Sequence, residues 1–269
     1  MIKTCLLTLA VVVMISTASD RGSLVENNDV LAYSHFTYEN GTTLYLYDTS
    51  RGEHREIYQA DGHIRFVFSA DGRIAFSENN GELFIVDTAA SDQVPFDLTR
   101  EIEVRGYPLG WSPDGQYLAF ATRQDEKRLL LYIWDGESIF DITPDTGAWT
   151  PEQYYVDWSN DGRLAVTVFF SFISPSDEGP SEIYLWDGNT MMNLSQNLEG
   201  EDRFPVWNKQ NELAFLAITG ERSRLYVWDG VSYRDGAPDA ASYRQIAPGM
   251  TAYYSSPTWT TNGSIAFGV

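Results

Sequence analysis

Few side chains in this sequence could act as a catalytic base or nucleophile, and they lie early in the chain. The histidines are His35, His54 and His63, and the single cysteine is Cys5. A serine–histidine–carboxylate triad would need one of these histidines as its base, and no G-x-S-x-G nucleophile elbow occurs. We therefore expect the histidines to be structural or solvated. The sequence favours a protein that is not an enzyme, without excluding one.

Metal and phosphate motifs are equally scarce. There is no zinc-finger spacing, no EF-hand loop and no phosphate-binding glycine loop, so no cofactor is implied. Carboxylates are densest at Glu199-Gly200-Glu201-Asp202 and Ser176-Asp177-Glu178, where oxygen ligands could bind calcium. We favour the alternative that both are solvated loops. Two carboxylates could also hydrolyse glycosides, but the sequence does not single out a pair.

The charge balance limits the partners. The chain has 38 acidic and 18 basic residues, for a formal net charge of -20. Such a chain repels nucleic acid and anionic membrane surfaces, so neither is expected as a partner, whereas basic or cationic partners are favoured. With 43% hydrophobic residues, the 269-residue chain can still bury a sizeable core.

The first nineteen residues have the layout of a secretory signal peptide. A basic start, Met1-Ile2-Lys3, precedes an apolar run from Cys5 to Ile15 and a small-residue segment from Ser16 to Ser19. The run is too short to span a bilayer comfortably. We therefore expect a signal peptide at 1–19, a linker at 20–29, and an exported protein, periplasmic or extracellular, that is not inserted in the membrane. The alternative is a buried N-terminal strand or helix.

Three short elements recur in the same order along the chain. The first is an aromatic residue followed by a tight turn, as in Trp111-Ser112-Pro113-Asp114-Gly115, and its copies lie 43 to 52 residues apart. The second is a short apolar segment such as Leu118-Ala119-Phe120. The third ends in aspartate, as in Leu131-Tyr132-Ile133-Trp134-Asp135. A weaker fourth element, such as Phe140-Asp141-Ile142-Thr143, ends several units.

These elements have the composition of β-strands bounded by turns. Four short antiparallel strands per unit predict an all-β β-propeller. We assign the residues at equivalent repeat positions a structural role, with tryptophans packing between blades and aspartates capping turns. These residues are Trp111, Trp158, Trp207, Trp259, Trp134, Trp186 and Trp228, with Asp114 and Asp161.

The unit from Trp111 to Phe120, followed by Leu131 to Asp135 and Asp141-Ile142-Thr143, resembles the WD40-like repeat of the TolB-type propellers. Related repeats form the propeller domains of prolyl-oligopeptidase-like enzymes. The resemblance covers residues 30–269, for which it implies one propeller domain, six blades and protein partners in a cell envelope. At Asn208-Lys209-Gln210-Asn211 the Asp-Gly turn is lost, which leaves the geometry of that turn open.

The number of blades is not fixed by the repeats. The second element occurs six times and the first and third five times each, so the chain holds material for five to six four-stranded blades. We favour six blades with an incomplete closure. In the alternative five-bladed ring, Thr258-Trp259 supplies the innermost strand to the N-terminal unit. An exposed strand edge at the end would favour self-association.

Three insertions interrupt the repeat, at residues 144–155, 169–180 and 232–243. Long loops on a rigid scaffold often carry binding residues, although simple variation between repeats is an equal alternative. Their aromatic residues are the candidate binding residues: Trp149, Tyr154, Tyr155, Phe172 and Tyr233.

The sequence thus favours an exported, non-catalytic β-propeller that serves as a protein-binding or scaffold module in the cell envelope or outside the cell. The alternative is a carbohydrate-binding or carbohydrate-active propeller that uses the central channel. Fold alone does not choose between them.

Overall fold

The computed structural model of the chain describes residues 30–38, 40–89, 94–101, 105–123, 129–146, 151–170, 181–196, 198–220, 222–231, 233–234, 237–238, 242–248 and 256–268. The predicted signal peptide and linker lie outside these residues, as do Trp149 and Phe172. Within the described ranges, no helix is long and apolar enough to cross a membrane.

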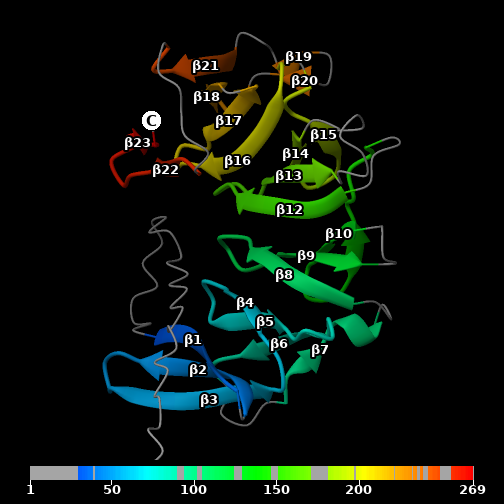
Figure 1. Cartoon of the computed structure of the whole chain (residues 1–269), viewed down its shortest axis with the longest axis vertical. Coiled ribbons are helices and arrows are strands. Elements are labelled where there is room, and N and C mark those ends of the chain that lie inside the picture. The colour runs from blue at the N-terminus through cyan, green and yellow to red at the C-terminus, as the bar shows by residue number, and fades with distance from the viewer. Residues whose placement is uncertain are drawn as a thin grey trace, which may run out of the picture.

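Antiparallel β-sheets follow one another along an open arc (Figure 1). Four of them have four strands, as propeller blades do. Sheet 2 contains β4 (Arg65–Phe68), β5 (Arg73–Ser77), β6 (Leu83–Asp87) and β7 (Phe96–Asp97). Sheet 3 contains β8 (Arg105–Trp111), β9 (Leu118–Arg123), β10 (Leu129–Trp134) and β11 (Ile139–Asp141). A 3-10 helix, η1 (Thr99–Glu101), lies between them.

The next two sheets repeat this order. Sheet 4 contains β12 (Pro151–Trp158), β13 (Leu164–Phe170), β14 (Glu182–Trp186) and β15 (Met191–Asn193). Sheet 5 contains β16 (Glu201–Trp207), β17 (Leu213–Thr219), β18 (Arg222–Trp228) and β21 (Tyr243–Ile246). Its fourth strand is β21 because a small hairpin, β19 (Tyr233–Arg234) and β20 (Ala237–Pro238), is inserted after β18.

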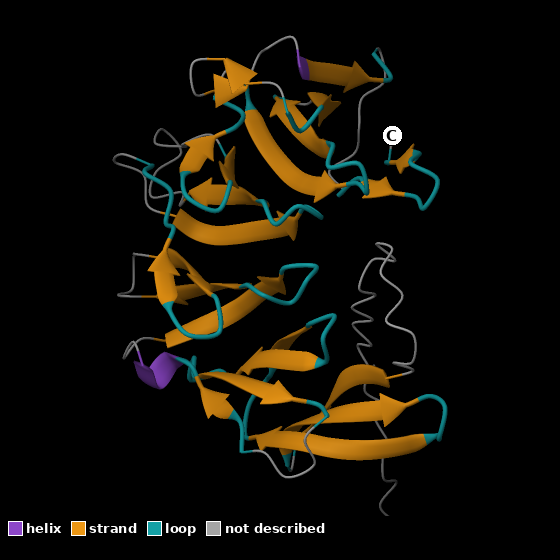
Figure 2. Cartoon of the chain, turned by 180° about the vertical axis from the view of Figure 1, so that it is seen from behind, coloured by secondary structure: helices purple, strands orange, loops and turns teal. Residues whose placement is uncertain are grey.

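The sheets at the two ends are smaller. Sheet 1 has three strands, β1 (Val30–Thr37), β2 (Gly41–Asp48) and β3 (Glu53–Ala60), and sheet 6 has two, β22 (Thr258–Trp259) and β23 (Ile265–Ala266). In the described part of the chain, β22 pairs with β23 and not with β1, and the two sheets lie apart in both views (Figures 1 and 2). The count of six blades and the mode of closure therefore stay predictions.

The strands begin and end where the repeat elements do, because the turns between them have a fixed hydrogen-bond pattern. After β8, the Gly115 amide donates to the Ser112 carbonyl at 2.9 Å, with Gly115 at a φ of 74°. Asp114 caps this turn by accepting from the Gln116 amide at 3.0 Å. The divergent turn after β16 has the same form, because Asn211 takes the positive φ (61°) and its amide donates to Asn208 at 3.1 Å. Asparagine tolerates this conformation better than most residues.

The hydrophobic core lies between consecutive sheets, with one cluster at each interface. Trp111 and Trp134 of sheet 3 pack with Leu83 of sheet 2. Trp158 and Trp186 of sheet 4 pack with sheet 3, Trp207 and Trp228 of sheet 5 pack with sheet 4, and Trp259 of sheet 6 packs on sheet 5. The repeat tryptophans therefore join each sheet to its neighbour.

Two arginines add polar links across these interfaces. Arg163 of sheet 4 lies 4.8 Å from the ring centroid of Trp207 in sheet 5 and donates to the Gly230 carbonyl. Arg73 of sheet 2 lies 4.5 Å from the ring centroid of Trp111 in sheet 3. Each guanidinium thus binds both an aromatic face and polar groups around a neighbouring turn.

Two expectations about loops differ from the structure. Tyr154 and Tyr155 lie on strand β12 and not in a loop, because the insertion before them ends where pairing with β13 starts. Asp202 belongs to β16 and is fully buried, so the reading of 199–202 as a solvated loop is wrong at this residue. The alternation of sides along β16 turns Asp202 inward.

Candidate functional site

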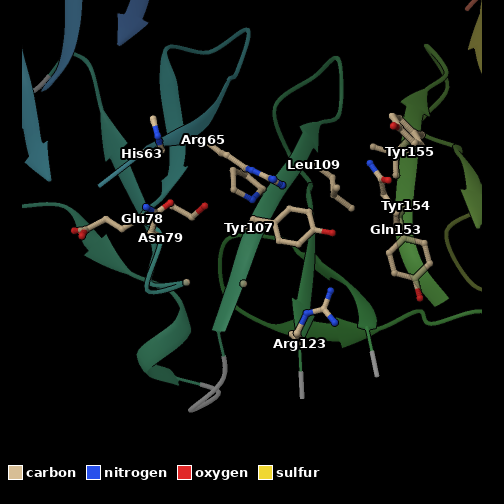
Figure 3. Close-up of a pocket in the computed structure, with 15 residues that line it drawn as sticks. His63, Arg65, Glu78, Asn79, Tyr107, Leu109, Arg123, Gln153, Tyr154 and Tyr155 are labelled. Atoms are coloured by element: carbon tan, nitrogen blue, oxygen red, sulfur yellow. The ribbon is translucent and has the colours of Figure 1, made fainter. Parts of the chain in front are cut away.

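A cleft of about 640 Å³ runs across the first strands of sheets 2, 3 and 4 (Figure 3). These strands, β4, β8 and β12, contact one another in series and face the inside of the arc (Figure 1). Each first strand contributes side chains to the lining, among them Arg65 of β4, Tyr107 of β8 and Tyr155 of β12. Tyr107 also packs against the hydrophobic cluster between sheets 3 and 4.

Two guanidinium groups flank a tyrosine in the middle of the cleft. Arg65, from β4, lies 5.1 Å from the ring centroid of Tyr107 on β8. Arg123, at the end of β9, approaches Tyr107 from the other side (Figure 3). Both arginine residues are exposed. The cleft therefore holds two guanidinium groups and one carboxylate, Glu78, so its local charge is positive in a chain whose net charge is -20.

The Tyr107 phenol remains protonated at neutral pH. Burial raises its pKa above 10.0, and this outweighs the nearby charges of Arg65 and Arg123, which favour the phenolate. Tyr107 can therefore donate a hydrogen bond to an anion that the arginines attract.

The β12 wall of the cleft is formed by Gln153, the exposed Tyr155 and Val156. The ring of Tyr155 packs edge-on against Phe169, at 5.2 Å, and against Phe204 of sheet 5, at 6.2 Å. Phe204 has a φ of 59°, at a bulge where β16 shifts register. A bulky residue in this conformation is uncommon, and such strain is often found beside binding sites.

The opposite rim comes from sheet 2 and the loops at its edge. Glu78 accepts a hydrogen bond from the Tyr58 hydroxyl. His63 lines the cleft and stacks on Phe36, with ring centroids 4.8 Å apart. Asn79 adds an amide that can donate or accept.

This arrangement can bind an anion but has no evident nucleophile. In the described ranges, the cleft's one serine, Ser77, is buried and has no hydrogen bond to His63. Among those same residues, no three histidine, cysteine or acidic side chains come together as a metal site. What the cleft offers is two guanidinium groups, phenol hydroxyls and aromatic faces, the groups that recognise carboxylates and planar ligands.

Only one of the predicted binding residues lines the cleft with an exposed side chain. That residue is Tyr155; Tyr154 is buried, and its hydroxyl donates to the Leu129 carbonyl at 3.0 Å. Tyr233 lies on β19 of the inserted hairpin. Trp149 and Phe172 are outside the described residues.

The sequence analysis missed Arg65, Tyr107 and Arg123. A signal for the first two exists, because Arg65 lies three residues before the repeat aromatic Phe68 and Tyr107 four before Trp111. Both residues lie on the first strand of their sheet, and the register shift between Pro108 and Gly110 accounts for the difference of one residue. Arg123 could not be found in this way, because it lies at the end of β9, beyond the repeated segment Leu118-Ala119-Phe120.

Comparison with known proteins supports the fold. No protein-family model matches the sequence, and no curated protein matches it. Among solved structures, the chain is similar to TolB from Acinetobacter baumannii, with a TM-score of 0.50 and 15% identity over 87% of this chain and 56% of that one. The chain therefore has a TolB-like β-propeller fold.

Other structural neighbours are propeller-containing enzymes. A prolyl endopeptidase matches with a TM-score of 0.63 and 15% identity over 90% of this chain and 38% of that one. Oligogalacturonate lyase from Vibrio parahaemolyticus matches with a TM-score of 0.58 and 14% identity over 89% of this chain and 67% of that one. This chain thus spans 56% of the TolB and 38% of the endopeptidase. At such low identities the likeness concerns the fold alone.

Proposed function

We propose that this chain is an exported, non-catalytic β-propeller module that binds a protein partner through an anionic segment held in the cleft. The observation that carries the proposal is the placement of Arg65 and Arg123 around Tyr107 on the inner side of the arc. A carboxylate entering the cleft would meet two positive charges and a phenol donor, and its flanking side chains would meet Leu109 and Tyr155.

The overall charge selects what kind of anion fits. A long polyanion would be repelled by the surrounding acidic chain, whose net charge is -20. A short acidic peptide segment presents a few carboxylates only, and it can enter a cleft of about 640 Å³. This differs from the expectation of a basic partner, because net charge averages over the surface while the cleft has its own local charge.

Fluorescence anisotropy tests the proposal with a labelled peptide containing glutamate and aromatic residues. We expect Arg65→Gln and Arg123→Gln each to weaken binding by about tenfold or more, because a hydrogen bond between charged groups contributes about 1.5–3 kcal/mol. Higher salt should also weaken binding. The matched control is Arg224→Gln on β18, an exposed arginine outside the cleft.

Two results would contradict the proposal. One is equal affinity for a lysine-containing peptide of the same length. The other is unchanged affinity of both cleft variants while the control behaves as the native chain does.

An acidic oligosaccharide is the second candidate ligand, because Tyr155 is 43% exposed at the cleft wall and could stack on a sugar ring. Oligogalacturonates used as competitors separate the two candidates. Displacement of the peptide by uronate oligomers, but not by neutral ones, would favour the sugar as the natural ligand.

Export rests on the layout of residues 1–19 alone. We expect the chain recovered from a secreting host to begin near Asp20, as intact-mass analysis would detect. Retention of Met1 in the recovered chain would refute export by signal cleavage.

A further inference from the structure

Two carboxylates meet at the interface between sheets 4 and 5, away from the cleft. Glu182 is the first residue of β14, and Asp202 is the second residue of β16. The Asp202 amide donates to the Ser181 carbonyl at 2.7 Å, which ties β16 to the residue before β14. The pair therefore spans an interface that the fold itself holds together.

Asp202 is in an unusual position for a charged residue. Its exposed fraction is 0%, and neither carboxylate oxygen accepts a hydrogen bond from the described part of the chain. Burying a carboxylate without a partner is costly, and proteins normally avoid it by pairing the charge or coordinating a metal. The side chain therefore lacks the partner that its burial requires.

The immediate neighbours of Asp202 supply oxygen and no positive charge. The side chains that act on it electrostatically are Ser195 and Glu182. The Ser195 hydroxyl donates to Glu182, with Ser195 Oγ 2.7 Å from Glu182 Oε2, and it accepts the Ile183 amide at 3.0 Å, so one lone pair remains for another contact. Asn193 bonds Glu182 through its amide nitrogen, because its Oδ1 accepts the Ser195 backbone amide at 3.1 Å.

The nearest arginine in sequence does not neutralise the pair. Arg203 forms an ion pair with Glu201 and lies 4.8 Å from the ring centroid of Phe169. It therefore faces the other side of β16 from Asp202, as alternation along a strand requires.

We propose that Glu182 and Asp202, with the Ser195 hydroxyl as a neutral oxygen ligand, bind a calcium ion that links sheets 4 and 5. These three side chains offer hard oxygen donors, which calcium prefers, and its flexible geometry accepts six to eight such ligands with water completing the shell. The two carboxylates balance its two positive charges. The site is separate from the cleft, so a bound calcium ion would stabilise the fold and would not contact a ligand in the cleft.

Terbium luminescence and calorimetry on the chelator-treated full chain test this site. Tyr184 lies two residues after Glu182 on β14 and can sensitise a bound terbium ion. We expect one calcium ion per chain by isothermal titration calorimetry, displacement of terbium by calcium, and a higher Tm with calcium. Asp202→Asn and Glu182→Gln should each weaken calcium binding by about tenfold or more, since affinity follows the ligand charge.

Glu137→Gln is the matched control, because Glu137 is an exposed carboxylate in the turn after β10. It should bind calcium as the native chain does. Absence of calcium binding at millimolar concentration would overturn the proposal. Calcium affinities of the Asp202→Asn and Glu182→Gln variants equal to that of the native chain would overturn it as well. If Asp202→Asn does not fold, Glu182→Gln alone decides, because Glu182 is only partly buried.

Discussion

Arg163 connects three kinds of interaction at one residue. Its guanidinium lies over Trp207, donates to the Gly230 carbonyl and bonds Asp161 at 2.8 Å, while its side chain is 13% exposed. Burial of Asp161 opposes its ionisation, but the hydrogen bonds from Arg163 and Ser159 prevail and lower its pKa. A short side chain at this position would lose all of these contacts together.

We expect Arg163→Ala to lower the free energy of unfolding by about 3 kcal/mol, because it removes a desolvated cation–π contact and charged hydrogen bonds. Urea denaturation measures this directly. Arg224→Ala is the control, since Arg224 is exposed on β18, and it should change stability by less than about 0.5 kcal/mol. Equal effects of the two substitutions would show that the Arg163 contacts are not stabilising.

Asp202 should make stability depend on pH in a calcium-free buffer. Burial, assisted by the charge of Glu182 and opposed by Ser195, raises the pKa of Asp202 from 3.8 to about 8. The folded chain therefore holds a proton that the unfolded chain releases. The stabilisation that this bound proton gives the folded chain is fully present below pH 3.8 and is lost as pH rises toward 8. The free energy of unfolding falls by at most about 1.4 kcal/mol per pH unit in that range.

Asp202→Asn cannot lose that proton, so the variant should remove this part of the decline between pH 5 and pH 8. Urea titrations at several pH values compare the two chains. Parallel stability profiles for the native chain and the variant would contradict the assignment.

Turns are the element on which the regular sheet pattern depends, and two of them form a natural comparison. Gly188 and Gly230 each follow a Trp-Asp pair and have positive φ values, 101° and 80°. A Cβ at Gly188 would meet nothing within 4 Å, whereas a Cβ at Gly230 would lie 1.9 Å from the Asn211 carbonyl oxygen. The first glycine is needed for its backbone conformation alone, and the second also for space.

Gly188→Ala should therefore cost only the backbone strain, about 1–3 kcal/mol. Gly230→Ala should destabilise the chain by at least about 2 kcal/mol more, because the backbone of a neighbouring turn must move. Denaturant midpoints with unchanged m values provide the comparison. Similar losses for the two variants would show that the Asn211 turn shifts freely.

Strand positions could be predicted from the sequence because each turn has its own local chemistry. Trp111 ends β8 and Leu118 begins β9, as the repeat indicates. The cleft could not be predicted, since it depends on three strands about forty residues apart lying side by side, which no local pattern encodes. The closeness of Asp202 to Glu182 could not be predicted for the same reason, because Glu182 lies in another sheet.

At the scale of the whole molecule, each sheet is stabilised chiefly by the sheets next to it. The hydrophobic clusters span sheets 1 and 2, 2 and 3, 3 and 4, 4 and 5, and 5 and 6. The first strands repeat this relation, since β8 contacts β4 and β12, and β12 contacts β16. Sheets 3 and 4 therefore have a complete neighbour on both sides, while sheets 1 and 6 have a neighbour on one side in the described residues.

The absence of pairing between sheets 1 and 6 in the described part of the chain has a consequence for how the molecule opens. A linear array of units that contact only their neighbours can lose its terminal units first. Amide protons of β9 and β13 should therefore exchange with deuterium far more slowly than those of β1 and β23. Hydrogen-exchange mass spectrometry would reveal a gradient from the middle outward. Uniform protection would instead mean that the molecule opens all at once, as a closed ring does.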